Sequence, residues 1–162
     1  QYARAGWRVF PLRPSTKRPL SAHGFHDATR DEGQLRRWWG EVPEAGVGIA
    51  TGQPSGLVVL DVDPRNGGDE TLGALVAQFG PLPPTVEVAT GGGGRHLYFR
   101  SPPGLGILAG ARGLWPGIDV KADGGYVAAP FSSHPSGARY RFTKSGGVGA
   151  TETIARYSYV DL

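Results

Sequence analysis

The sequence predicts an α+β domain, and three of its features lead to that fold class. Segments typical of strands outnumber segments typical of helices, and the two do not alternate strictly as they would in a doubly wound α/β protein. The 27 glycines and 14 prolines separate short apolar segments and form no low-complexity tract. The 162 residues suffice for one domain with a real core, which we expect to be a piece cut from a longer multidomain protein.

The first part of the chain predicts strands around a short helix. Residues 7–12, WRVFPL, predict a strand, and the long polar loop after it is of a length often found in functional loops. Asp31 is the expected N-cap of a helix, whose apolar side consists of Leu35, Trp38 and Trp39. Two strands follow at 46–51 and 56–62, joined by a tight turn. The second is apolar on both faces, which is typical of a central strand.

The second part of the chain predicts one helix followed mostly by sheet. Apolar residues recur at helical spacing from Leu72 to Phe79, and the Gly-Pro pair at 80–81 predicts the end of this helix. Five later segments are typical of strands: 85–90, 95–100, 117–122, 125–130 and 138–142.

Composition limits the classes of protein to which the chain can belong. Without cysteine it has neither disulfides nor a thiolate zinc site, so we expect no zinc. No apolar run approaches the roughly 18 residues of a membrane span, so we expect a cytoplasmic protein with no membrane partner. A net charge of +3 does not by itself diagnose a nucleic-acid binder, and a solvated surface of mixed charge explains it about as well. The candidates for nucleic-acid contact are Lys17, Arg18, Arg36 and Arg37.

The segment LVVLDVD, residues 57–63, ends an apolar strand in two carboxylates. Asp61 and Asp63 are two residues apart, so in a strand they point to the same face at a separation of about 6.5 to 7 Å. Side by side they would repel each other, which is easiest to explain if divalent metal lies between them. A second interpretation stays open, because Asp63 begins a turn-forming segment and could cap it instead.

The segment TGGGGRHLYF, residues 90–99, has four consecutive glycines between two predicted strands. Glycine lets backbone amides approach phosphate oxygens closely, and Arg95 and His96 can add charge-assisted hydrogen bonds to the same anion. The segment is not a P-loop, because no Gly-Lys-Ser/Thr follows and the next element is a strand. A flexible hairpin with an incidental basic end remains the alternative.

The segment GIDVKADGG, residues 117–125, carries an isolated acid in a strand pattern. If its apolar neighbours Ile118 and Val120 face the core, Asp119 shares the opposite face with Lys121. A carboxylate in an apolar strand needs a partner. Asp119 is therefore the candidate for a third metal ligand.

These three segments, in this order, resemble the motifs of the bifunctional primase/polymerase (prim-pol) domain of plasmids, phages and other mobile elements, a branch of the archaeo-eukaryotic primase superfamily. The flanking TKRPL, DATRD, LRRWW and GVGIATG also resemble that domain, so the similarity spans roughly residues 3–142. The resemblance implies a primase-polymerase fold with mixed or antiparallel sheets. It would comprise a small N-terminal αβ part (1–55), an RRM-like catalytic half (56–142) and a tail (143–162) that matches nothing we can name.

The resemblance also implies which residues form the site. Asp61, Asp63 and Asp119 would bind the metal ions, and His96 would contact the phosphates of the incoming nucleotide. The expected nucleotide contacts are Gly92, Gly93, Gly94, Arg95, His96, Lys121, Ser132 and His134. The chain has Phe131 where the family often has a second proline before Ser132, and it lacks the cysteine-bound zinc stem of some relatives.

The activity that the resemblance implies is template-directed nucleotidyl transfer to a 3′-hydroxyl, assisted by two Mg²⁺ or Mn²⁺ ions. The expected partners are single-stranded or primed DNA, dNTP or NTP substrates, and a fused or associated helicase. Two alternatives stay open. One is a catalytically silent nucleic-acid-binding module of the primase fold. The other is a metal-dependent sugar-nucleotide transferase, which also has Asp-x-Asp at a strand end but would not explain Asp119 or the segment around His96.

Overall fold

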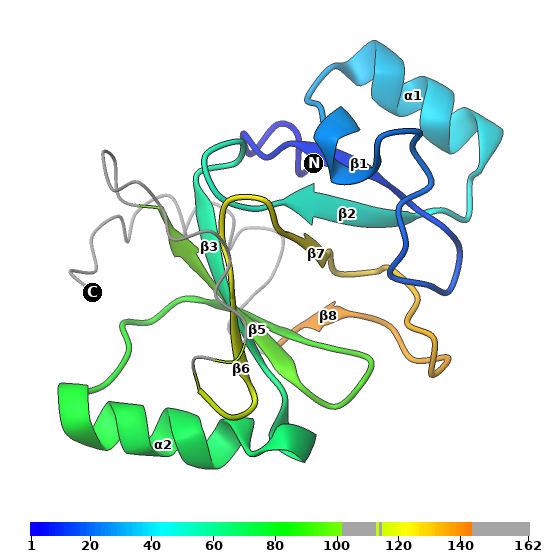
Figure 1. Ribbon diagram of the computed structural model, residues 1–162. Helices are drawn as coiled ribbons and strands as arrows, with labels where there is room; N and C mark the ends of the chain where they lie inside the picture. Colours follow the sequence, from blue (N-terminus) through cyan, green and yellow to red (C-terminus); the bar gives the residue numbers. More distant parts are fainter. Residues whose placement is uncertain (102–112, 114, 144–162) are drawn as a thin grey trace.

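The computed structural model describes residues 1–101, 113 and 115–143, and in that part it is an α+β structure with two antiparallel sheets and two α-helices (Figure 1). The predicted fold class is confirmed. Sheet A has the strand order β1-β2-β7, made of β1 (Val9–Leu12), β2 (Gly46–Ala50) and β7 (Tyr126–Ala128). Sheet B has the order β6-β3-β5-β4-β8, made of β3 (Leu57–Val62), β4 (Val86–Ala89), β5 (Arg95–Arg100), β6 (Ile118–Lys121) and β8 (Arg141–Phe142).

Each helix lies against a different sheet. Helix α1 (Glu32–Glu41) begins at Asp31, whose side chain accepts a hydrogen bond from the Gln34 amide, as the sequence predicts. Its apolar side packs against the core beside sheet A. Helix α2 (Gly68–Phe79) lies at the end of sheet B where β3 stops (Figure 1), and its last residue, Phe79, is exposed. Neither helix of the described residues has the length and apolar character needed to cross a bilayer.

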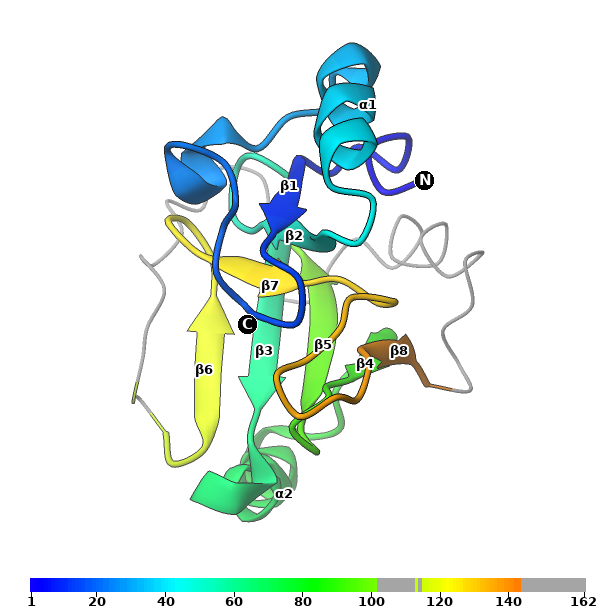
Figure 2. The same cartoon turned by 90° about the vertical axis from the view of Figure 1, so that its right-hand side faces the viewer.

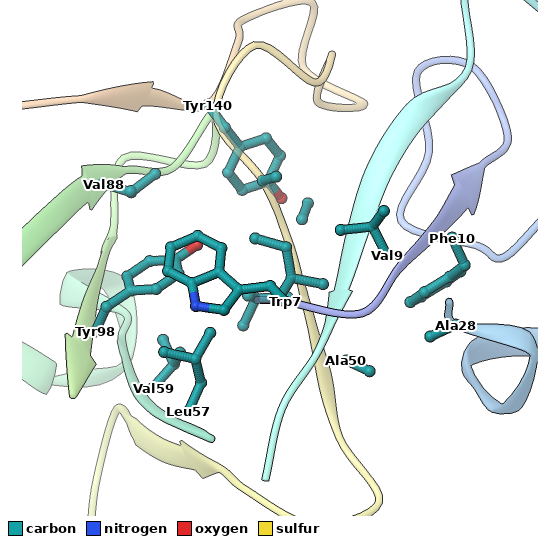
Figure 3. Packing of buried hydrophobic residues seen from close by; sticks show 14 of the residues in the cluster. Trp7, Val9, Phe10, Ala28, Ala50, Leu57, Val59, Val88, Tyr98 and Tyr140 are labelled. Atoms are coloured by element: carbon teal, nitrogen blue, oxygen red, sulfur yellow. The ribbon is translucent and has the colours of Figure 1, made fainter. Parts of the chain in front are cut away.

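The main core lies between the two sheets (Figure 3). Trp7, which precedes β1, stacks on Tyr98 of β5 with their ring centroids 5.9 Å apart. Leu57 and Val59 lie next to this pair on the inner face of β3 and are almost completely buried. Full burial of an aliphatic or aromatic side chain stabilises a fold by roughly 1.5 to 3 kcal/mol, so this contact joins the two sheets into one body.

The chain crosses between the sheets more than once. The tight turn predicted after residue 51 is present, but β2 and β3 on either side of it belong to different sheets. Strand β7 then returns to sheet A from the second half of the chain, so a boundary at residue 55 does not separate the two sheets. The long loop after β1 passes in front of sheet B, as Figure 2 shows. The predicted tail, apart from residue 143, lies outside the described residues.

Candidate active site

Strand pairing in sheet B brings three of the predicted site residues into one row. Asp61 on the central strand β3 lies opposite His96 on β5 and opposite Asp119 on β6. Residues directly opposite in antiparallel strands point to the same face, with Cβ atoms about 4.5 to 5.5 Å apart. The row Asp119-Asp61-His96 therefore runs across three neighbouring strands, although its members are far apart in the sequence.

Two carboxylates of this row converge on one positive charge. The Nζ atom of Lys121 lies 2.7 Å from Oδ2 of Asp119 and 3.8 Å from Oδ2 of Asp61. Carboxylate oxygens are the ligand type that Mg²⁺ and Mn²⁺ require, so Asp61 and Asp119 have the chemistry that such an ion would need.

Asp63 has other partners. It is the N-cap of the 3₁₀-helix η2 (Pro64–Asn66), and its carboxylate accepts from the Arg65 amide at 3.1 Å and from Nδ2 of Asn66 at 2.9 Å. It also forms a bidentate pair with the Arg65 guanidinium, which holds the pKa of Asp63 below its usual value. Within the described residues, no three His, Asp or Glu side chains are grouped so that they could hold a metal ion. In this structure Asp63 thus takes the capping role.

His96 is buried, with 5% of its surface exposed, and its ring lies beside Tyr140 at a centroid distance of 5.8 Å. Its Nε2 atom lies 3.6 Å from Oδ1 of Asp61, and its buried Nδ1 atom has no hydrogen-bond partner among the described residues. Burial lowers the pKa of His96 to about 4, with a smaller opposing effect from Asp61. At neutral pH the ring is therefore uncharged, and it would meet a phosphate as a neutral hydrogen-bond donor.

The glycine turn between β4 and β5 is closely packed on both sides. A side chain at Gly91 would collide with His134, and one at Gly94 would collide with the carbonyl oxygen of Val62. The amides of Gly93 and Gly94 donate to Thr90 inside the turn, at 3.1 and 3.0 Å. Of the three glycines expected to bind phosphate, only Gly92 has an amide without such a bond in the described part of the chain.

Two side-chain nitrogen atoms, from His134 and Arg65, lie close to Gly92. A Cβ atom built at this glycine would lie 3.5 Å from Nε2 of His134 and 3.6 Å from Nη2 of Arg65. The His134 imidazole and the Arg65 guanidinium thus lie close to the Gly92 backbone, and groups of these types suit a phosphate.

A cleft of about 440 Å³ brings together the acids and part of the glycine turn, whereas His96 and His134 are not among its lining residues. The lining includes Asp61, Asp119, Asp63, Arg65, Gly92 and Lys17. Lys17 lies on the loop that follows β1, a strand of sheet A. Its charge helps burial to lower the pKa values of His96 and His134, so it lies within electrostatic reach of both rings. The cleft is therefore acidic along the sheet and basic along its rim.

Other predicted site residues have partners outside this cleft. The Ser132 hydroxyl is buried and accepts from the Val47 amide of β2 at 2.9 Å, so it supports sheet A. Arg95 pairs with Asp69 in the first turn of α2 at 2.6 Å. Arg36 and Arg37 are bonded to side chains of their own helix, α1.

Reasoning from sequence missed three residues of the site region: Arg65 and Trp115, which line the cleft, and Tyr140. Arg65 lies in the segment that the sequence predicts to be a turn, and its charge next to an expected metal ligand is a usable signal. Tyr140 lies between the rings of His96 and His134, at 5.8 and 5.7 Å. No local pattern marks it, because the contact depends on where the loop between β7 and β8 returns.

Comparison with known proteins agrees with the geometry. Residues 1–156 match the family model described as "Bifunctional DNA primase/polymerase, N-terminal". A search of curated proteins finds no match. The family match covers almost the whole chain, including all three motifs and the elements that place them, and it supports a nucleotidyltransferase function of the primase/polymerase type. The chain belongs to the bifunctional DNA primase/polymerase family.

Proposed function

We propose that this domain is a DNA primase/polymerase that adds nucleotides from dNTP or NTP to a 3′-hydroxyl on a DNA template. The observation that supports this most directly is the row Asp119-Asp61-His96, whose two carboxylates line a cleft together with Arg65 and Gly92. Nucleotidyl transfer needs carboxylates that hold cations beside donors that hold a triphosphate, and one cleft contains both.

The carboxylates would hold two Mg²⁺ or Mn²⁺ ions, with Asp61 and Asp119 as ligands in their present positions and Asp63 as the third. When bound, these ions supply charge neutralisation and lower the pKa of the attacking 3′-hydroxyl. Lys121 balances the charge of these acids. The Gly92 amide, His134 and the buried His96 would orient the triphosphate, while Gly93 and Gly94 keep the turn close to β3.

The template would follow the basic rim of the cleft. Lys17 and Arg18 lie on the loop that reaches over sheet B, so we assign them to the DNA backbone. Arg36 and Arg37 lie on α1, which is at the top of Figure 2, far from α2 and the end of β3 at the bottom. They are therefore the weaker candidates for this contact. Action in the replication of a phage, plasmid or other mobile element, together with a helicase, is proposed from family membership alone.

Primer extension tests the proposal. The protein is incubated with primed and unprimed single-stranded DNA, labelled dNTP or NTP, and Mg²⁺ or Mn²⁺. We expect metal-dependent extension of the primer and its loss in Asp61→Ala, whereas Glu44→Ala, an exposed acid after α1, keeps the wild-type rate. A folded wild-type protein that binds DNA but yields no labelled product would establish the silent-module alternative instead.

A further inference from the structure

The pair Asp63-Arg65 makes one of the expected metal ligands unavailable in the free protein. Oδ1 of Asp63 accepts from Nε of Arg65 at 3.0 Å, and Oδ2 accepts from Nη2 at 3.0 Å. A carboxylate engaged in this way cannot present the same oxygen atoms to a divalent cation. The pair is nevertheless easy to exchange, because the Arg65 side chain is 72% exposed and exposed ion pairs are worth only about 0 to 1 kcal/mol.

Arg65 has a second possible partner without moving far. The same Nη2 atom lies near the Gly92 backbone and Nε2 of His134, and Arg65 and Gly92 line the same cleft. A guanidinium binds phosphate in a two-pronged geometry at least as well as it binds carboxylate. A phosphate at this position would therefore compete directly with Asp63 for Arg65.

We propose that Arg65 is a positioning residue that changes partner when the substrate binds. In the free protein its guanidinium covers Asp63. When the triphosphate enters the cleft beside Gly92, the guanidinium moves to the phosphate and Asp63 becomes free to complete the metal site around Asp61. This inference rests on the proposed function and adds to it a coupling between nucleotide binding and metal binding.

Such a coupling has a distinctive signature. Because Arg65 competes with the cation for Asp63 but binds the nucleotide, its removal strengthens the binding of one ligand and weakens that of the other. A residue that only supports the fold would weaken both or neither. The Asp63 cap of η2 does not depend on the guanidinium, since it uses the backbone amide of residue 65, so a substitution here leaves η2 in place.

The test compares Arg65→Met with the wild-type protein. Affinity for Mn²⁺ alone is measured by electron paramagnetic resonance of the free ion, and affinity for a fluorescent non-hydrolysable dNTP is measured in EDTA. We expect Mn²⁺ to bind about twofold to fivefold more tightly and the nucleotide to bind more weakly by a similar factor. The control is Arg4→Met, which removes another exposed arginine-carboxylate pair, with Glu32, and changes neither affinity.

Equal effects on both ligands, or none, would overturn the partner exchange while leaving the polymerase proposal intact. The proposed function fails separately, if the wild-type protein neither extends a primer nor binds Mn²⁺ more tightly than Asp61→Ala does.

Discussion

One face of strand β3 is used in two different ways. At its beginning, Leu57 and Val59 are 1% and 0% exposed and pack between the sheets near Trp7. At its end, the Asp61 side chain is 31% exposed and faces the cleft. The three side chains alternate along the strand and so point to one side, but sheet A covers only the first part of that side (Figures 1 and 2).

The comparison shows where stability and activity are located. The covered half of the strand gains free energy from apolar burial. The open half places like charges side by side, and Nδ1 of the buried His96 has no hydrogen-bond partner within the described part of the chain. Both arrangements cost free energy. Lys121 and Arg65 offset part of this cost in the free protein. Substitutions in the two halves should accordingly have opposite consequences.

The largest effect is expected in the open half. Asp119→Asn should slow primer extension on the order of a hundredfold to a thousandfold, because a carboxylate of the proposed metal site loses its charge. Its free energy of unfolding should stay within about 0.5 kcal/mol of the wild-type value, as for most partly exposed positions. Single-turnover extension and urea unfolding measure the two quantities. Extension at the wild-type rate would remove Asp119 from the site.

In the covered half, Leu57→Ala should lower the free energy of unfolding by about 2 to 5 kcal/mol, because it opens a cavity between the sheets. At a temperature where the variant stays folded, the extension rate constant should remain near the wild-type value. Thermal and urea unfolding, followed by extension assays at low temperature, test this. A folded variant without activity would show that the two halves of the strand are not independent.

His96 links the two halves and should make stability depend on pH. Its pKa in the folded protein, about 4, lies below the ordinary value of 6.5, so the unfolded chain binds more protons between these values. The free energy of unfolding should therefore decrease as the pH falls from 6.5 towards 4, with a contribution from His96 of about 2 to 3 kcal/mol at pH 4.5. Urea unfolding of His96→Gln at pH 7 and 4.5 should lack this contribution. An unchanged pH dependence in the variant would contradict the burial of a neutral ring.

The smallest effect concerns the rim of the cleft. Lys17→Ala should weaken binding of single-stranded DNA severalfold and reduce the slope of log affinity against log salt by about 1, as expected for one lost phosphate contact. Arg36→Ala, above the covered half, should change affinity less than twofold because its guanidinium is already paired with Glu32. Fluorescence anisotropy at several salt concentrations measures both. If Arg36→Ala weakens DNA binding more than Lys17→Ala does, the template binds along α1 instead.

Much of the fold was predictable because its signals are local. The capped helix after Asp31, the apolar central strand and the helix up to Phe79 all follow from spacing over a few residues. The candidate site was predictable in part. Reasoning from sequence found the residues of the row Asp119-Asp61-His96, but it did not find that Arg65 covers Asp63 or that Ser132 is used by sheet A. Arg65 and Ser132 lie in a turn and a loop, and the direction of a side chain there depends on the path of the backbone.

The sequence by itself determined which residues carry charge at strand ends and, through alternation along a strand, that Asp61 points to the same side as Val59. It also determined that the turn at 91–94 is made of glycine, the residue type that can approach β3 closely enough. Only the tertiary structure decided that β5 and β6 pair with β3 in the register that sets His96 and Asp119 opposite Asp61, and that the loop after β1 brings Lys17 to the same cleft. The reason is that the register of distant strands and the path of a loop between two sheets are set by packing over the whole core, which no short stretch of residues encodes.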